Sequence, residues 1–542
     1  MNTFRSPEIT LKFPLSLLGK CSVFVNRYAL FFLIMILSGI SLFCFMYYLN
    51  NGLGIAYNDA RSHLDIGRRV VEGLKPGLAQ LGSVWLPLPH LLTVPTIWND
   101  FMWHSGLAGA LQSMISFVGT ALLIYFFLLR LGVGLWGRLT GVLVFVANIN
   151  VLYLQSTAMT ELLLLATMTA GVYELLIWSK TEKILPLIKS SFWIMLSTLI
   201  RYDGWFLLLM AACLIFIKTF KEKGYKPSEG IFLFFSILGG LGVIMWVLWN
   251  QLIFKDALYF IFGPYSARAQ QTQLEEAGVL ATKGDFFLSL KIYFYALMYN
   301  SYGFTVILGI IGAVFMYLDK KIPVNMRLML LTLLAPFIFN VLALYLGHSV
   351  LFIQGVSGGT WFNARYGIMM MPSLAVFIGY LMHRTGYLKY SVLGLWLFVT
   401  VFAFANQDAV TLDDARVGSS QKNVSEVSGW LREHTKDEEG FILISAASHD
   451  AIIFSSGLPM KRFIHEGTGK YWESATTTPD RWARWIIMRT YDMNDLTFNT
   501  VSKTDALSKY DLVGQYPFAD IYELKPEYIS QLNTKPIYGK QK

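Results

Sequence analysis

Charged residues and cysteines are both scarce in this chain of 542 residues. Charged side chains make up 15% and apolar ones 55%, with a mean hydropathy of +0.49. Because a typical soluble domain is about 25% charged, this balance excludes an ordinary soluble protein and a disordered chain. The cysteines Cys21, Cys44 and Cys213 lie in or beside apolar segments, so neither a disulfide framework nor a zinc site is predicted. The sequence also has no Walker-type phosphate loop and no evident internal repeat.

The few charges are unevenly distributed. Residues 407–542 hold 16 basic and 19 acidic residues, a density normal for a soluble domain, whereas residues 1–406 carry a net charge of +12. We therefore predict a cytoplasmic leader at 1–27, a transmembrane domain at 28–406 and an extracytoplasmic soluble domain at 407–542. The overall charge of +9 does not indicate nucleic-acid binding, because the basic excess lies at the ends of apolar segments, where membrane topology explains it.

Eleven apolar segments are candidates to cross a bilayer, which takes about 20 residues per helix. They are 28–49, 106–129, 136–154, 161–178, 184–200, 204–218, 229–252, 288–318, 325–347, 366–383 and 390–406. Lysine and arginine gather in the leader and in alternate connections, which places the N-terminus in the cytoplasm and residues 407–542 on the opposite side. The prediction is an integral protein of the plasma or inner membrane with a polytopic α-helical domain.

The first outer loop, 50–105, is long enough to carry function. Apolar residues recur on one helical face between 60 and 74 and charged residues occupy the rest, which is typical of an amphipathic helix lying on the membrane surface. A proline-broken apolar stretch follows at 85–98 and includes Trp85 and His90. His90 could bind phosphate or cap this short segment.

Residues 407–542 alternate strand-like and helix-like patterns, which predicts a small α/β domain. We expect strands at 441–445, 461–465 and 520–523, and helices at 450–454 and 479–488. His449–Asp450 and His465–Glu466 are residue types that bind metals, but nothing in the sequence fixes their geometry, and no metal site is predicted.

Two acidic residues at the outer boundary are candidate functional groups. Asp59 follows the first span by a few residues, and Glu161 opens the fourth span. Each has a structural alternative: Asn58 or Asp59 could cap the amphipathic helix, and Glu161 could be placed by the helix dipole alone. An ionisable residue at the edge of so apolar a segment is nevertheless a functional candidate.

Two arginine motifs are expected on the same side. Arg201–Tyr202–Asp203 separates the fifth and sixth spans, and Asn363–Ala364–Arg365–Tyr366 follows a glycine-rich loop and opens the tenth. The planar guanidinium group can bind two phosphate oxygens at once. The alternatives are a salt-bridged turn at Arg201 and an arginine snorkelling to the interface at Arg365.

The order of these motifs resembles the GT-C superfamily of polytopic glycosyltransferases, which use polyprenyl-phosphate-linked sugars. The resemblance covers residues 25–406 and is strongest to the family-39-type branch, which includes protein O-mannosyltransferases and aminoarabinose transferases. Asn58–Asp59 stands where many members have a paired acidic motif, so the amide of Asn58 is a departure from the family pattern. Family members differ in metal dependence, so the resemblance implies no certain cofactor and leaves a divalent metal open.

The resemblance also implies roles for individual residues. Asp59 would act as the general base that activates an acceptor hydroxyl for inverting attack on the sugar, and Arg365, Arg201 and His90 would bind the donor phosphate. Residues implied to bind the substrates are Asn58, Glu161, Asp203, Tyr366 and Trp85, although Glu161 and Asp203 could instead orient the two arginines. The implied partners are a polyprenyl-phosphate sugar donor, a lipid, glycan or protein acceptor, and membrane lipids, without nucleic acid.

Two other functional classes stay open at this point. A lipid or saccharide transporter or flippase would place its functional charges near the bilayer midplane, whereas the candidate residues here are predicted at one rim. A non-catalytic scaffold or receptor would bind a partner through residues 407–542.

Overall fold

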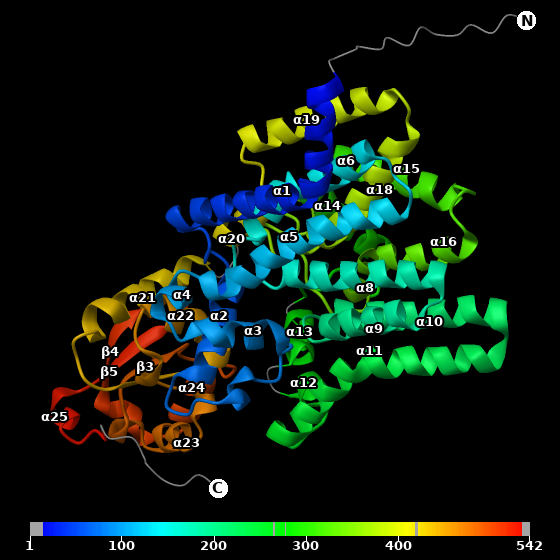
Figure 1. Cartoon of the computed structure of the whole chain (residues 1–542). Helices are drawn as coiled ribbons and strands as arrows, with labels where there is room; N and C mark the ends of the chain where they lie inside the picture. The colour runs from blue at the N-terminus through cyan, green and yellow to red at the C-terminus, as the bar shows by residue number, and fades with distance from the viewer. Residues whose placement is uncertain (1–14, 264–265, 277, 418–420, 534–542) are drawn as a thin grey trace, which may run out of the picture.

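The computed structural model describes residues 15–263, 266–276, 278–417 and 421–533 (Figure 1). Helices make up most of the chain to residue 417, and a five-stranded sheet with short helices follows. Of the predicted leader at 1–27, residues 1–14 lie outside the described residues. Residues 15–27 form the start of the first long helix, ahead of the apolar part that begins at Leu30.

Eight helices of the described chain are long and apolar enough to cross a membrane, or nine if one bent pair is counted as a span. These spans contain α1 (Leu15–Asn50), α5 (Leu107–Arg130), α8 (Glu161–Thr181), α10 (Asp203–Lys223), α11 (Tyr225–Phe254), α16 (Val324–Leu330) with η2 (Leu331–Leu334) and α17 (Ala335–Tyr345), η3 (Ala364–Met370) with α18 (Met371–Arg384), α19 (Leu388–Ala405) with α20 (Val410–Val417), and the bent pair α14 (Phe286–Ser301) and α15 (Gly303–Leu318). The two other predicted spans are shorter helices, α6 (Leu135–Val146) with α7 (Ile149–Leu154) and α9 (Ile184–Thr198). The polytopic helical architecture is therefore confirmed, with fewer full-length spans than the eleven predicted.

The segment 288–318, predicted as one span, is instead two helices, α14 and α15, which meet at 108°. Tyr302 lies between them with a left-handed φ of 64°. An L residue in that region cannot continue a right-handed helix, so the chain turns sharply at this residue. No proline marks the break, which is why the apolar pattern did not predict it.

The first outer loop folds into α2 (Asn58–Val71), η1 (Leu78–Leu81), α3 (Leu88–Ile97) and α4 (Asp100–His104). The predicted helix is confirmed as α2, but its polar face is not exposed, because Asp65, Arg68 and Arg69 are buried. Helix α2 packs against α3, α5 and the helix α22 (Ala446–Ser456) of the C-terminal domain. Gly67 permits the contact with α3, since a Cβ atom there would lie 2.2 Å from Thr93 Oγ1.

The C-terminal domain is built on one mixed sheet in the order β2-β1-β3-β5-β4. The strands are β1 (Phe441–Ile444), β2 (Phe463–Ile464), β3 (Ala483–Met488), β4 (Tyr510–Gln515) and β5 (Asp520–Leu524). Strands β2, β1 and β3 are parallel, and β5 pairs antiparallel with β3 and β4. The predicted α/β class and the three predicted strands are confirmed, whereas β4 was not predicted.

The helix predicted at 479–488 is wrong. Residues Pro479–Arg481 form the short helix η6, and the rest is the central strand β3. Five of its six residues are buried, because β1 and β5 flank the strand. A strand buried on both faces is a continuous apolar run, which periodicity cannot distinguish from a short helix.

The remaining short helices connect these elements. They are α12 (Tyr259–Phe262), α13 (Ala267–Glu276), α21 (Gln421–Thr435), η4 (Met460–Arg462), η5 (Glu466–Thr468), α23 (Lys470–Thr477), α24 (Leu496–Val501), η7 (Asp505–Lys509) and α25 (Pro526–Ile529).

The sheet domain lies beside the first outer loop, at one end of the membrane helices (Figure 1). Helix α20 fixes this junction from the chain that follows the last span. The backbone N–H and hydroxyl of Thr411 donate to Asn150 Oδ1 of α7, at 3.0 and 2.8 Å. The loop helix α2 forms the second connection through its contact with α22.

Candidate functional site

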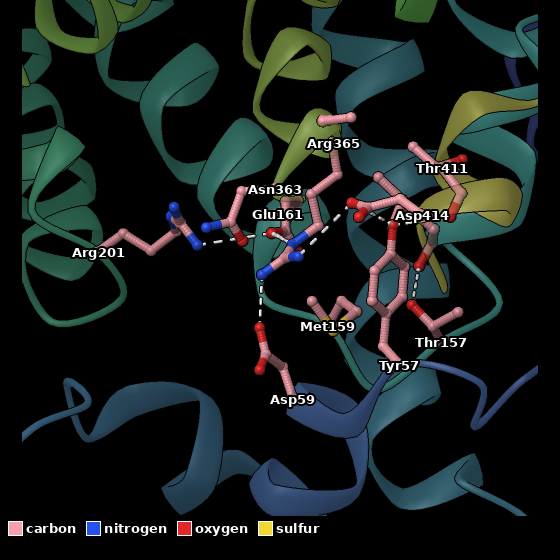
Figure 2. Close-up of polar contacts among 12 residues, drawn as sticks. Tyr57, Asp59, Thr157, Met159, Glu161, Arg201, Asn363, Arg365, Thr411 and Asp414 are labelled. Atoms are coloured by element: carbon pink, nitrogen blue, oxygen red, sulfur yellow. Dashed lines mark hydrogen bonds and ion pairs between the residues drawn. The ribbon is translucent and has the colours of Figure 1, made fainter. Parts of the chain in front are cut away.

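Arg365 is the centre of a buried cluster of charges at the end of the membrane helices that faces the first outer loop (Figure 2). Its Nη2 donates to Asp59 Oδ2 at 2.5 Å, and its Nε donates to Glu161 Oε1 at 3.0 Å. Nη1 lies 3.9 Å from Asp414 Oδ2. Because Arg365 is only 5% exposed and holds three carboxylates, the snorkelling alternative is wrong.

Arg201 joins the same cluster from the opposite side of Glu161 (Figure 2). Its Nη1 lies 3.5 Å from Glu161 Oε1 and its Nε lies 3.4 Å from Asp203 Oδ2. Both guanidinium groups lie over the ring of Tyr366, at 4.7 and 5.3 Å from the centroid, which adds cation–π attraction. Glu161 therefore bridges two arginines, which places its carboxylate between two fixed positive charges.

Helix ends explain why the carboxylates meet here. Glu161 and Asp203 are the first residues of α8 and α10, and Asp59 lies in the first turn of α2. The partial positive charge at a helix N-terminus stabilises an anion there. Asn363 begins η3 with a left-handed φ of 53°, and Arg365 follows in that 3₁₀ helix. The helix N-termini therefore stabilise the carboxylates of the cluster, and the two arginines are the groups that could bind an anion such as phosphate.

Two residues of the cluster were not predicted from the sequence. The Tyr57 hydroxyl donates to the Thr411 carbonyl at 2.7 Å and lies 3.2 Å from Asp414 Oδ2. Arg365 lies over the Tyr57 ring at 4.9 Å. Burial raises the pKa of Tyr57, so the phenol stays protonated and able to donate. The only sequence signal for Tyr57 is its position beside Asn58, and none marks Asp414, which lies beyond the last predicted span.

Three predicted residues lie outside the arginine cluster. His90, on α3, is 1% exposed, and its Nε2 is 2.8 Å from Nδ1 of His63, a residue that was not predicted. The Trp85 ring packs on His63 with centroids 4.2 Å apart. Asn58 Oδ1 accepts a hydrogen bond from Arg61 at 3.4 Å. The N-cap of α2 is Tyr57, so the prediction that Asn58 or Asp59 caps this helix is wrong.

A second charged cluster lies at the C-terminal end of α2. Arg69 forms a buried ion pair with Asp450 of α22. The neighbouring Asp65 accepts a hydrogen bond from Trp103 Nε1 at 3.0 Å, and burial together with Asp450 raises its pKa. These contacts tie the loop helix that carries Asp59 to the C-terminal domain.

The sequences His449–Asp450 and His465–Glu466 of the C-terminal domain do not form a common site, because their side chains have different partners. His449 Nε2 pairs with Asp495 at 2.7 Å, and Glu466 accepts from the backbone N–H groups at the start of α22. Within the described ranges, no group of three or more His, Cys, Asp or Glu side chains is arranged to hold a metal ion.

No protein-family model matches the chain, and no curated protein matches its sequence. Among solved structures, ArnT from Cupriavidus metallidurans bound to undecaprenyl phosphate aligns with a TM-score of 0.57 at 10% identity, over 91% of this chain and 98% of ArnT. The apo form of that ArnT gives 0.56 with the same identity and coverage. The chain shares the fold of ArnT.

The shared ArnT fold confirms the GT-C-like architecture that the sequence predicted. The 91% coverage is too large to be confined to residues 1–406, so the similarity to ArnT extends into the C-terminal domain. The oligosaccharyltransferase of Archaeoglobus fulgidus in complex with zinc and sulfate aligns with a TM-score of 0.47 at 11% identity, over 84% of this chain and 67% of that one. A score this low carries no argument of its own.

Proposed function

We propose that this chain is a membrane glycosyltransferase that moves a sugar from a polyprenyl-phosphate-linked donor to an acceptor hydroxyl on the extracytoplasmic side, with inversion at the anomeric carbon. The observation that carries the proposal is the contact of the buried Arg365 with the partly exposed Asp59, which sets an accessible carboxylate beside a guanidinium group that could bind phosphate. The fold shared with ArnT, which has been crystallised with undecaprenyl phosphate, supports the class of donor.

Asp59 is the general base in this proposal. Its side chain is 42% exposed, so an acceptor hydroxyl has access to it while Arg365 holds one of its oxygens. Asp59 takes the proton as the acceptor oxygen bonds to the anomeric carbon and the bond from that carbon to the phosphate oxygen breaks. A positioned base typically contributes about 10²–10⁴-fold to the rate.

Arg365 and Arg201 receive the leaving group. As the bond to the sugar breaks, the phosphate gains negative charge, which two guanidinium groups stabilise strongly in a site with little water. Glu161 and Asp203 contact the arginines directly, which supports an orienting role for both carboxylates rather than binding of sugar hydroxyls. The Tyr366 ring lies within cation–π distance of both guanidinium groups and so helps to hold them in place.

The proposal also fixes an orientation in the membrane. The N-terminus would be cytoplasmic, and the cluster, the first outer loop and the C-terminal domain would lie on the far side, where the donor head group and acceptor meet. The glycine-rich loop at 348–365 would close over the site. The charged residues lie at helix ends rather than at mid-helix positions, which favours this reading over the transporter alternative.

The decisive test is reconstitution of the purified chain in liposomes with undecaprenyl-phosphate sugars, both hexoses and pentoses, and a panel of lipid, glycan and peptide acceptors. The proposal expects release of undecaprenyl phosphate with at least one donor and acceptor, and an arm with EDTA measures any metal requirement. Movement of the lipid-linked sugar across the bilayer without product would support a flippase instead.

A further inference from the structure

A pair of histidines lies next to the arginine cluster and has no role in the mechanism above. His63 is on α2, four residues after Asp59, so the two side chains share one face of the helix. The Nδ1 atom of His63 is 2.8 Å from His90 Nε2, and Trp85 packs on the ring of His63. Thus α3 and the preceding loop hold His63 in one orientation beside the proposed base.

The surroundings of His90 determine which nitrogen of each ring carries hydrogen. His90 Nδ1 is buried and has no hydrogen-bond partner among the residues that the structure describes. If His63 donated to His90 Nε2, the hydrogen of His90 would lie on that Nδ1 as a buried and unpaired N–H group. Such groups are rarer in proteins than unfilled acceptors. The favoured arrangement therefore has His90 Nε2–H donating to His63 Nδ1, which leaves the hydrogen of His63 on Nε2.

Both rings are uncharged near neutral pH. Burial, together with the positive charges of the neighbouring Arg365 and Arg201, lowers the pKa of His63 to about 3. Burial, with His63 and Arg69 nearby, lowers the pKa of His90 well below its usual value. His63 thus adds a hydrogen-bond donor to the site without adding charge to a cluster that already contains two arginines.

We propose that His63 is a substrate-contacting residue whose Nε2–H donates to an oxygen of the phosphate–sugar head group, and that His90 is the positioning residue that fixes this tautomer. The inference rests on the proposed function and deepens it. The oxygen belongs either to the phosphate or to a sugar hydroxyl, since both accept the same hydrogen bond from an uncharged donor.

The variants His63→Gln and His63→Leu test the inference, because the glutamine amide restores a donor near the Nε2 position and leucine does not. We expect His63→Leu to lower kcat/KM for the donor about 2- to 100-fold, where the lower part of the range is for a lost hydrogen bond to a neutral partner and the upper part for one to a charged partner, and His63→Gln to recover most of it. His90→Leu should give a smaller loss of kcat/KM. His90→Gln should restore it, because the glutamine amide again donates a hydrogen bond to His63 Nδ1.

Binding measurements with two probes identify the contacted oxygen. If His63→Leu weakens binding of undecaprenyl phosphate alone, the phosphate is the partner, and if it weakens only the sugar-linked donor, a sugar hydroxyl is. The inference is overturned if His63→Leu turns over and binds both probes like wild type. It is also overturned if His63→Gln is as impaired as His63→Leu while both unfold at the wild-type temperature.

The wild-type protein tests the proposed function independently of the role of His63. A wild-type chain that releases undecaprenyl phosphate while His63→Leu matches it overturns the role of His63 alone. A folded wild-type chain that neither binds nor turns over any lipid-linked donor overturns both statements together.

Discussion

Replacing Asp59 by asparagine should separate catalysis from folding. The Asp59 side chain is 42% exposed, and its ion pair with Arg365 is therefore expected to contribute only about 0–1 kcal/mol to stability. Arg365 keeps Glu161 as a partner, 3.0 Å away, so the substitution leaves no buried charge unpaired. Loss of a general base, in contrast, should lower turnover about 10²–10⁴-fold, equal to about 2.7–5.4 kcal/mol in the barrier.

The assay for Asp59→Asn is release of undecaprenyl phosphate in liposomes, with thermal unfolding in detergent alongside. Asp100→Asn is a matched control, because Asp100 also has an exposed carboxylate paired with a buried arginine, Arg68, in the same loop at 2.6 Å. We expect the control to keep activity within a few-fold and both variants to unfold near the wild-type temperature. Turnover by Asp59→Asn above about a tenth of wild type would refute the assignment of the base.

Three further predictions concern Arg365, the ion pair of Arg69 with Asp450, and the two histidines. Arg365→Lys should lower kcat/KM at least about 100-fold, because an ammonium group cannot replace the planar two-oxygen contact; steady-state kinetics with varied donor measure it. Asp450→Ala should lower the free energy of unfolding by about 3–5 kcal/mol, because it leaves Arg69 buried without its ion pair, whereas Asp505→Ala on the surface should change it little in denaturant titrations. Between about pH 6.5 and 4, His63 and His90 bind protons in the unfolded chain but not in the folded one, because burial lowers their pKa values. The free energy of unfolding should therefore decrease as pH falls, by up to about 1.4 kcal/mol per pH unit for each histidine. A His90→Gln variant whose stability has the same pH dependence as wild type would contradict this.

Much of the fold follows from residue patterns. Segments of about 20 apolar residues have few structures open to them in a bilayer, so every predicted span is helical in the structure. The errors arise where one pattern of apolar residues is compatible with two different structures. At the bend, Asn300–Ser301–Tyr302–Gly303 is too short a break in the apolar pattern to divide the predicted span, and the buried strand β3 resembles a helix in sequence because both of its faces are covered.

The candidate site was predictable only in part. Asp59, Glu161, Arg201, Asp203 and Arg365 stand out because a charge at the end of an apolar segment is costly unless it has a partner or a task. Their direct contacts confirm that the five residues meet, whereas their chemical roles stay proposals.

Other members of the site lack such a signal. Asp414 comes from a segment of ordinary soluble composition, and only the packing of α20 on α7 and η3 brings it to the arginine. His63 lies in a helix whose charged residues suggested a solvated face, and only the burial of α2 reveals its partner on α3.

Helix α2 connects the arginine cluster mechanically to the C-terminal domain. Its 14 residues form a rod about 21 Å long. Asp59 lies at one end, and Arg69, held by the C-terminal domain, lies near the other. Asp59 lies ten residues from Arg69, about 15 Å along the helix, so a tilt of about 4° about the docked end moves Asp59 by roughly 1 Å, a displacement that can change a rate about 10²-fold. Any molecule that shifts the sheet domain slightly would therefore move Asp59 through α2 without contacting the arginine cluster.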